Sequence, residues 1–145
     1  MSVVVKFIKL NEDVVSPLYA NDGDAGADLS SIEYVTIYPQ ERLLVSTGLS
    51  MAIPNGYVGL IHPRSGMAFN NGVTVLNTPG TIDSGYRGEI KVLLFNSDKF
   101  NAKHIKKGDR IAQLVIQQVE KAQFVMYNDL DDTSRSFNGF GSTGE

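Results

Sequence analysis

The chain of 145 residues has no cysteine, no tryptophan and only two histidines. Without cysteine it can form neither disulfides nor thiolate metal sites, and two isolated histidines argue against a zinc site. A chain without cysteine is suited to a reducing compartment, so we expect a cytoplasmic location. The apolar residues 1–10 include Lys6 and Lys9, and they therefore predict neither a signal peptide nor a membrane span.

Charge is also scarce and nearly balanced. The formal net charge is −3, whereas proteins that bind nucleic acid through their surface are usually basic. We therefore expect neither nucleic acid nor a membrane as a partner. Hydrophobic residues make up 42% of the chain and charged residues 20%, which is typical of a globular protein rather than a disordered one. The length indicates one domain.

No helix of ordinary length is predicted. Short β-branched and apolar runs are separated by Gly, Pro and Asn, which is typical of a sandwich or barrel of antiparallel strands. We predict an all-β fold of the jelly-roll kind, with one short helix near residues 65–70. The predicted strands are residues 3–10, 34–38, 42–46, 49–53, 57–62, 73–76, 88–96, 110–116 and 123–126.

The stretch 77–89 contains more kinds of polar residue than a turn requires. It is either a decorated surface hairpin between the strands 73–76 and 90–95 or a ligand site. Asp83 stands among small and apolar residues, and partial burial would suit it for a general base that activates water. Tyr86 offers a flat face and a hydroxyl group, and Gly80 frees the backbone for contact with a ligand edge.

The stretch 63–68 predicts a phosphate site at the start of the short helix. Arg64 carries a fork that fits phosphate oxygens, Ser65 adds a hydroxyl donor, and the amide of Gly66 lies in the first helical turn. The alternative is that Ser65 is only an N-cap and Arg64 only a solvated charge.

Two further segments contain polar residues in unusual settings. Asp28 lies among small residues that let a ligand approach, although a capping or turn aspartate explains it as well. Gln113 is predicted on the same strand face as Ile111 and Val115, so it needs a hydrogen-bond partner in the protein or in a ligand. Arg110 is interpreted as one half of a buried structural ion pair.

The composition changes near residue 128. We divide the chain into a β domain at residues 1–128 and a flexible arm at residues 129–145 that closes over an active site. In the arm, Phe140 is suited to stacking on a planar group, while hydroxyls and a guanidinium suit anionic oxygens. A frayed terminus is the alternative. The anion-binding candidates of the arm are Arg135, Ser142 and Thr143.

Together these residues comprise one acid to activate water, a second acid suited to a metal, several phosphate donors and aromatic side chains for a ring. This set indicates metal-assisted hydrolysis of a nucleotide phosphate. The residues themselves do not identify the base.

Five segments of the chain resemble, in order and spacing, the five motifs of the trimeric dUTP pyrophosphatases (dUTPases). The resemblance implies a distorted jelly roll (the dUTPase-like β-clip) and a homotrimer with active sites shared at subunit interfaces. It also implies Mg²⁺-dependent hydrolysis of dUTP to dUMP and pyrophosphate, which keeps uracil out of DNA and supplies dUMP for dTMP synthesis. The five segments are residues 25–29, 63–66, 80–89, 108–113 and 139–144.

The resemblance also implies a role for each candidate. Asn77 and the backbone at Gly80 would bind uracil, and Tyr86 would pack on the deoxyribose. Asp83 would deprotonate the water that attacks the α-phosphorus, and Asp28 would hold Mg²⁺ through bound water. The implied contacts to the phosphate chain are Arg64, Ser65, Gly66 and Gln113, and those of the arm are Arg135, Phe140, Ser142 and Thr143.

One departure from the family pattern lies in the arm. Ser136 and Asn138 occupy places where the family usually has glycine. Asn tolerates the left-handed conformation, whereas Ser does so less well, and Phe137 adds bulk beside Phe140. We expect these changes to affect the register and closing rate of the arm more than the chemistry.

Three rival functions remain. The related dCTP deaminases share the fold and parts of the second and fourth motifs, but residues 80–86 favour the dUTPase. A dUTP-sensing protein of the same fold is expected to lack Asp83 or the arm, and both are present. A carbohydrate-binding jelly roll would leave Arg64 and Arg135 without a role.

Overall fold

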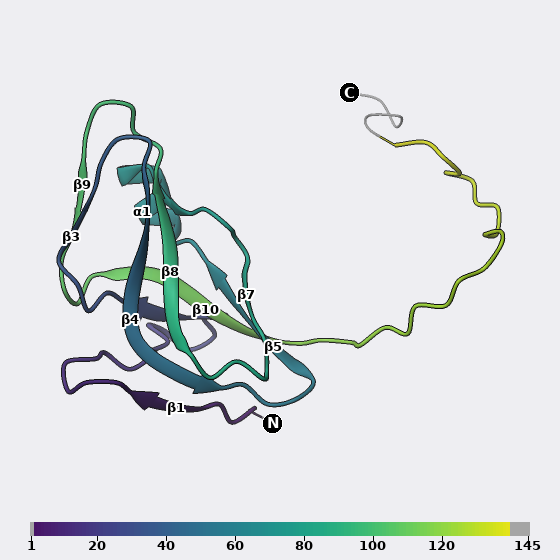
Figure 1. The fold of residues 1–145 in the computed structure, drawn as a ribbon, viewed down its shortest axis with the longest axis horizontal. Helices are drawn as coiled ribbons and strands as arrows, with labels where there is room; N and C mark the ends of the chain where they lie inside the picture. Colours follow the sequence, from purple (N-terminus) through teal and green to yellow (C-terminus); the bar gives the residue numbers. More distant parts are fainter. Residues whose placement is uncertain (1, 140–145) are drawn as a thin grey trace.

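Two four-stranded antiparallel sheets pack against each other in the computed structural model, which describes residues 2–139 (Figure 1). A third, two-stranded sheet and one short helix lie at one end of them. The first sheet has the order β1 (Lys6–Lys9), β4 (Arg42–Ala52), β8 (Glu89–Asn96) and β6 (Val73–Val75). The second has the order β2 (Gly26–Ser30), β10 (Arg110–Gln118), β5 (Tyr57–His62) and β7 (Gly80–Ile82). The remaining elements are β3 (Val35–Ile37), which pairs with β9 (Lys103–Ile105), and α1 (Ser65–Asn71). The predicted all-β jelly-roll class with one short helix is confirmed.

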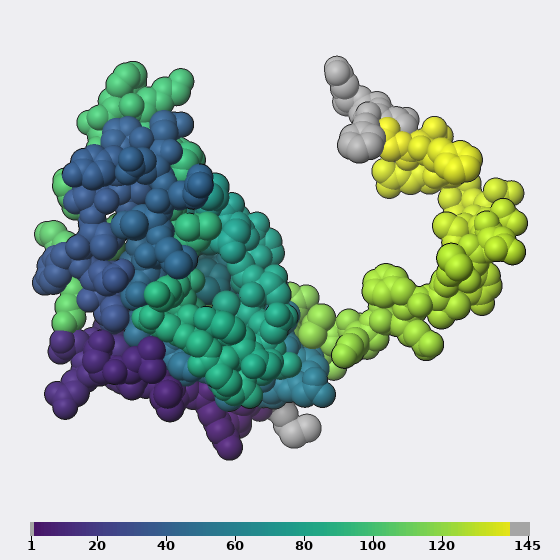
Figure 2. All heavy atoms as spheres, in the orientation of Figure 1, coloured from purple at the N-terminus to yellow at the C-terminus, as the bar shows by residue number. Residues whose placement is uncertain are grey.

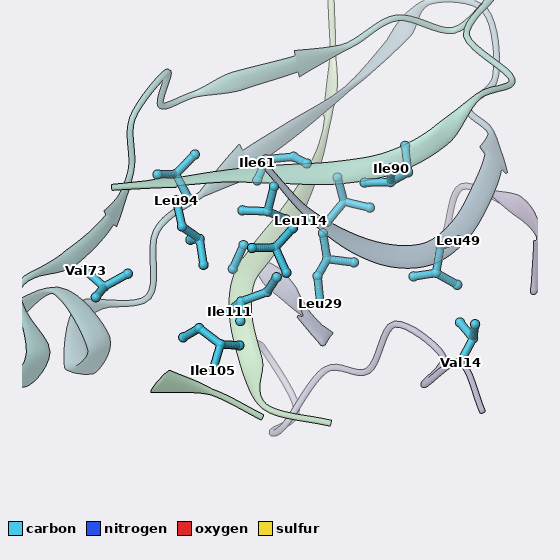
Figure 3. Packing of buried hydrophobic residues seen from close by; sticks show 14 of the residues in the cluster. Val14, Leu29, Leu49, Ile61, Val73, Ile90, Leu94, Ile105, Ile111 and Leu114 are labelled. Atoms are coloured by element: carbon cyan, nitrogen blue, oxygen red, sulfur yellow. The ribbon is translucent and has the colours of Figure 1, made fainter. Parts of the chain in front are cut away.

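The apolar side chains that join the two sheets come from alternate positions of their strands (Figure 3). In β8 every second residue from Ile90 to Asn96 is buried, because successive side chains of a strand point to opposite faces. Leu29 of β2 and Leu114 of β10 meet this face from the second sheet. The core therefore fixes which face of β2 and β10 remains for polar side chains.

Two separate strands were predicted at residues 42–46 and 49–53, with a break at Thr47 and Gly48, and this break is wrong. The strand β4 continues through them with a bulge, at which its pairing with β8 shifts between Ser46 and Leu49. Gly48 has φ of +69° and sits where an added Cβ would run into Val14. A glycine at a bulge accommodates both the left-handed backbone and the close packing.

The strand predicted at residues 123–126 is also wrong. Beyond Gln118 the described chain leaves the body in an extended path, and residues 119–139 are exposed (Figures 1 and 2). A strand needs a neighbour for its backbone hydrogen bonds, which composition alone cannot supply. Within residues 2–139, no helix has the length and apolar character needed to cross a bilayer.

The sequence pattern also missed three short strands, β2, β7 and β9. The strand β7 lies inside the stretch 77–89, which was expected to be loop or hairpin, and it pairs with β5 of the second sheet. The stretch thus crosses from one sheet to the other, since β6 before it and β8 after it belong to the first. The strand β9 has three residues, two of them polar, so it gives almost no hydrophobic signal.

Candidate active site

Five of the predicted site residues line one hollow of about 400 Å³ beside β2 and β10, which we call the β2–β10 pocket. Strand pairing brings them together, because β10 has β2 on one side and β5 on the other. Gln113 lies opposite Asp28 on β2 and opposite His62 at the end of β5. The chain then turns through Pro63 into α1. The predicted residues in the pocket are Asp28, Arg64, Ser65, Gly66 and Gln113.

Asp28 lies between two arginines in this pocket. Its Oδ1 accepts a hydrogen bond from Nε of Arg64 at 3.0 Å, and its Oδ2 accepts one from Nη1 of Arg110 at 3.0 Å. The Asp28 side chain is 16% exposed and that of Arg110 is 53% exposed. The predicted ion pair of Arg110 is therefore present, but it is not buried. Asp28 is a paired carboxylate rather than a helix cap.

Gln113 finds its partner inside the protein, as its Nε2 donates to the carbonyl of Pro63 at 3.0 Å. Gly26, two residues before Asp28 on β2, makes room for it, since a Cβ added to Gly26 would lie 3.0 Å from Cδ of Gln113. The side chain is thereby held against the turn that leads into α1. This explains why residue 26 is a glycine.

The residue that caps α1 is Arg64, with extended φ and ψ of −91° and 128° and no capping bond from its side chain. The alternative that Ser65 is the N-cap is therefore wrong, because Ser65 is already the first helical residue. Ser65 and Gly66 are exposed at the pocket. Their position leaves the hydroxyl and the first helical amides available to a ligand.

A second hollow, of about 590 Å³, lies beside the tip of the stretch 77–89; we call it the β7 pocket. Asp83 follows the last residue of β7, and its carbonyl accepts from the amide of Tyr86 at 3.0 Å to close a tight turn. Asp83 is exposed in the single chain, so the expected partial burial is wrong there. The reason is that β7 is the edge strand of its sheet. The other lining residues are Leu44, Thr81, Ile82, Tyr86, Glu89 and Lys91.

Tyr86 is fixed although it is 44% exposed. Its hydroxyl donates to the carbonyl of Glu89 at 2.9 Å, and a Cβ added to Gly88 would lie 2.6 Å from its Cζ. The side chain of Glu89 in turn accepts from the amide of Gly48 at 3.0 Å, which ties this segment to the bulge of β4. The ring is therefore held flat over a glycine.

The β7 segment also presents backbone groups to solvent. Because β5 pairs with one side of β7 only, the other side is a free sheet edge. Asn77 lies beside this edge, within 3.3 Å of where a Cβ on Gly80 would be. The peptide bond between Thr78 and Pro79 is cis. A free edge with an amide side chain beside it can hydrogen-bond a planar heterocycle.

Sequence reasoning passed over two residues at these hollows. Arg110 was interpreted as purely structural, and Lys91, on the exposed face of β8, was not considered. The pairing of Arg110 with Asp28 depends on the contact between β2 and β10, which the chain order does not reveal. Lys91 alternates with buried neighbours, and in the sequence such a lysine is indistinguishable from any solvated one.

One chain does not bring all the predicted residues together. The two pockets share no lining residue. Gln113 lies opposite His62, whereas Ile82, which precedes Asp83, lies opposite Gly59. These positions on β5 are roughly 10 Å apart along the strand, and Asp83 lies farther still. The candidate base and the candidate phosphate donors thus line separate pockets of the chain.

The described part of the arm supplies no lining residue to either pocket, and it extends away from the body (Figures 1 and 2). Nε of Arg135 donates to the carbonyl of Asn138 at 3.0 Å within the arm itself. Ser136 has φ of +46°, the left-handed conformation that its hydroxymethyl side chain disfavours. Phe140, Ser142 and Thr143 lie outside the described residues.

Residues 2–139 contain no group of three or more acidic or histidine side chains that would enclose a metal ion. Asp28 shares its pocket with one other carboxylate, Asp24. Mg²⁺ keeps several waters and is commonly bound by one or two carboxylates together with substrate phosphates. The donor set therefore fits a magnesium ion that arrives with a phosphate chain.

Comparison with known proteins agrees with this geometry. The family model described as dUTPase matches residues 12–144. The chain is 53% identical over 143 residues to the deoxyuridine 5'-triphosphate nucleotidohydrolase of Thermobifida fusca, covering 99% of this chain and 80% of that protein. It is 48% identical over 149 residues to the protein of the same name from Mycobacterium leprae, covering 99% and 97%.

Solved structures show the same fold. The Staphylococcus bacteriophage 80alpha dUTPase with dUPNHPP superposes with a TM-score of 0.93 at 28% identity, covering 99% of this chain and 100% of that one. A mutant dUTPase of phage phi11 of S. aureus, whose structure reveals the coordination of a structural Mg(II) ion, has a TM-score of 0.82 at 26% identity and covers 88% and 98%. The family model spans nearly the whole chain and the relatives share about half of its residues, so the chain belongs to the dUTPase family.

Proposed function

We propose that the chain hydrolyses dUTP to dUMP and pyrophosphate with the help of Mg²⁺. The observation that carries this proposal is the β2–β10 pocket, where Asp28, Arg64, Ser65, Gly66 and Gln113 converge from three distant segments. Guanidinium, hydroxyl and amide donors are suited to phosphate oxygens. The relatives are deoxyuridine 5'-triphosphate nucleotidohydrolases, and this indicates that the nucleotide is dUTP.

The free edge of β7 is the proposed uracil site. Backbone amides and carbonyls of Gly80–Ile82, with Asn77 beside them, can pair with the polar edge of uracil. Cytosine presents a donor where uracil presents an acceptor, so it would leave a backbone group unpaired, which discriminates strongly. Thymine is rejected by crowding at C5, since one methyl group is worth about 1–3 kcal/mol.

Tyr86 is proposed to select the deoxyribose. Its ring is held over Gly88 by the hydrogen bond to Glu89, so it presents a fixed flat surface. A sugar packed on this surface has no space for a 2′-hydroxyl group. The selection depends on the ring staying in place rather than on a polar contact.

Asp83 is proposed as the general base. Its carboxylate takes a proton from a water molecule, whose oxygen forms a bond to the α-phosphorus. The bond between the α-phosphorus and the bridging oxygen breaks, and pyrophosphate leaves. A positioned base of this kind contributes about 10²- to 10⁴-fold to the rate.

Magnesium would be held by the phosphate chain and, through bound water, by Asp28. When bound it would withdraw charge from the phosphate oxygens. Arg64, Ser65 and Gln113 orient the same oxygens from the protein side. Asp28 would thus be the one carboxylate that this chain supplies to the metal, and substrate and water would supply the other ligands.

We further propose a homotrimer in which each active site combines residues of more than one subunit. The separation of the two pockets within one chain supports this, because Asp83 does not reach the β2–β10 pocket of its own subunit. The arm supports it as well. It leaves the body after β10 and extends away from it (Figure 1), which would allow it to cover a neighbouring subunit. Arg135, Phe140, Ser142 and Thr143 would then close on the nucleotide.

The cellular role proposed is removal of dUTP before its incorporation into DNA, together with supply of dUMP for dTMP synthesis. A cytoplasmic location suits this role and the absence of cysteine from the sequence. A test of the reaction is to incubate the protein with Mg²⁺ and either dUTP or dCTP, and to measure pyrophosphate and ammonia. We expect pyrophosphate from dUTP alone. Ammonia from dCTP would instead assign the chain to the deaminases.

A further inference from the structure

The contacts of Arg64 bear on how the β2–β10 pocket accepts an anion. Nε of Arg64 donates to Asp28 at 3.0 Å, and its Nη1 points to the carbonyl of Arg110 at 3.4 Å. A guanidinium binds a phosphate through two parallel hydrogen bonds, which are donated by Nε and Nη2 or by Nη1 and Nη2. Each of these pairs contains a nitrogen that already has a partner in the protein. Because Nε carries a single hydrogen, Arg64 must release Asp28 before it can bind phosphate through Nε and Nη2.

The charged residues of the pocket also fail to favour a free anion. Its charged lining residues are two arginines, Arg64 and Arg110, and two aspartates, Asp24 and Asp28. A strongly anionic phosphate chain thus meets a pocket in which the formal charges cancel. Asp28 is the aspartate in contact with the arginines, whereas Asp24 accepts from the backbone and side chain of Asn21 at 2.8 and 3.3 Å.

Arg110 differs from Arg64 in how it contacts Asp28. It bonds Oδ2, while Arg64 bonds Oδ1, so one arginine can leave while the other stays. Arg110 begins β10 and lies opposite Ser30, close to Asp28 on the paired strand. Asp28 therefore keeps one anchor from its own sheet when Arg64, which comes from the turn before α1, moves away.

We propose that Asp28 competes with phosphate for Arg64 until a divalent cation accompanies the phosphate, and that Arg110 is the positioning residue that retains Asp28 during the exchange. This inference rests on the proposed function, because it assigns a triphosphate chain to the pocket. When Asp28 shares its charge with a cation, its hold on Arg64 weakens, and the guanidinium turns to the phosphate oxygens. Without the cation, free phosphate compounds bind poorly, so the pocket selects metal-loaded nucleotides.

The test uses inorganic pyrophosphate as the probe and isothermal calorimetry as the readout, with EDTA or with Mg²⁺. In EDTA, Asp28→Asn should bind pyrophosphate at least about tenfold more tightly than wild type, because a carboxylate in direct contact with Arg64 is gone. The matched control is Asp24→Asn, which removes the same charge from the same pocket without touching Arg64. We expect its gain to be at most about threefold, as for exposed charges. Equal gains in the two variants would overturn the proposal.

A second pair of variants tests Arg110 and does not depend on how Asp28→Asn folds. In Arg110→Gln, Asp28 has only Arg64 as a cationic partner. The ratio of the affinity for pyrophosphate with Mg²⁺ to the affinity for pyrophosphate in EDTA should therefore fall several-fold. Arg110→Lys should restore part of this ratio. A simple loss of positive charge would weaken the more highly charged metal-free pyrophosphate more than its magnesium complex, so the ratio would rise. A ratio that is unchanged or raised would contradict the role of Arg110. Release of pyrophosphate from dUTP by the wild-type protein is scored separately, so failure of the exchange is distinguishable from failure of the proposed function.

Discussion

Asp28 and Arg64 are 36 residues apart in the sequence and form an ion pair with an Nε–Oδ1 distance of 3.0 Å. The pair joins β2 to the turn before α1 and thereby forms one wall of the β2–β10 pocket. Asp83, the candidate base, belongs to the other pocket. The candidate phosphate donors and the candidate base therefore lie in different pockets of one chain.

Two inactive variants should restore activity to each other if the sites are shared between subunits. Arg64→Gln disables the phosphate side and Asp83→Asn the base side, so either protein alone should be inactive. After mixed trimers form by unfolding and refolding together, some sites receive Arg64 from one subunit and Asp83 from another. Random mixing should return about a quarter of wild-type activity.

Pyrophosphate release measured before and after refolding of the mixture checks this prediction. The control is a mixture of Asp83→Asn with the double variant that carries both substitutions, which contains no intact Asp83. Recovery in the first mixture and not in the control is expected. If neither mixture recovers, although both contain folded trimers by light scattering, the shared site is wrong.

Sugar selection should depend on the glycine beneath the Tyr86 ring. In Gly88→Ala, the new methyl group occupies the place of the ring, so Tyr86 must move away. We expect the preference for dUTP over UTP, as the ratio of kcat/KM values, to fall by about tenfold, while turnover of dUTP changes less.

The control for this variant is Gly85→Ala, since a Cβ there has no neighbour within 4 Å. It changes the same turn without displacing the ring. Steady-state kinetics with both nucleotides gives the ratios. An unchanged ratio in Gly88→Ala would mean that Tyr86 does not exclude the 2′-hydroxyl group.

Much of the fold was predictable because its strands are long or strongly apolar. The strand β5 was predicted with its observed bounds, Tyr57–His62, and β8 to within one residue, because their β-branched and aromatic residues lie between clear turn signals. The helix at Ser65 was found as well. These are local signals.

The misses have a common physical cause, which is that they depend on partners distant in the sequence. β7 is strand only because β5 lies beside it, and residues 123–126 are not strand in the described chain because no neighbour pairs with them. For the site, the chemistry of Asp28 and Gln113 was inferred from their small and apolar neighbours. Their actual partners, Arg64 and Pro63, come from a segment that only the fold brings near.

Removal of the arm should affect catalysis and spare the fold. Residues 119–139 are exposed along their whole length, so truncation after Ser134 removes no described core contact. We expect turnover of dUTP to fall by about 10²-fold, because closing groups that position the phosphates are lost. The melting temperature should stay within about 2 °C of that of the full chain.

The comparison uses the full chain and the truncated chain at equal concentration, with kinetics and differential scanning calorimetry. Full turnover in the truncated protein would refute the closing role of the arm. A large drop in melting temperature would show that the arm contributes to assembly rather than to closure alone.

The loop after β8 should make stability sensitive to acid. The carboxylate of Asp98 accepts from the amides of Phe100 and Asn101 and from Nζ of Lys103. These contacts, first the bond from the amide of Phe100, hold the pKa of Asp98 well below its ordinary value. A lowered pKa means that the folded state binds fewer protons than the unfolded state. The stabilisation is therefore complete above the unfolded pKa of about 3.9 and is lost as pH falls from there toward the folded pKa.

Asp98→Asn should accordingly lower the melting temperature at pH 7, and the difference from wild type should shrink as pH falls below about 4. The control is Asp109→Asn, whose carboxylate accepts a bond from the amide of Lys106 in another loop. Thermal unfolding at several pH values gives the comparison. A difference between Asp98→Asn and wild type that is the same at pH 7 and pH 3 would contradict the assignment.

The most direct test of the proposed function is pyrophosphate release from dUTP, dCTP, dTTP and UTP with Mg²⁺, for wild type and for Asp83→Asn. We predict release by wild type from dUTP alone, and a fall of about 10²- to 10⁴-fold in the variant, with unchanged folding because Asp83 is exposed. Release from dUTP that survives in Asp83→Asn would show that another group activates the water. No release by wild type, with dUTP still bound, would contradict the hydrolase and favour a protein that senses dUTP.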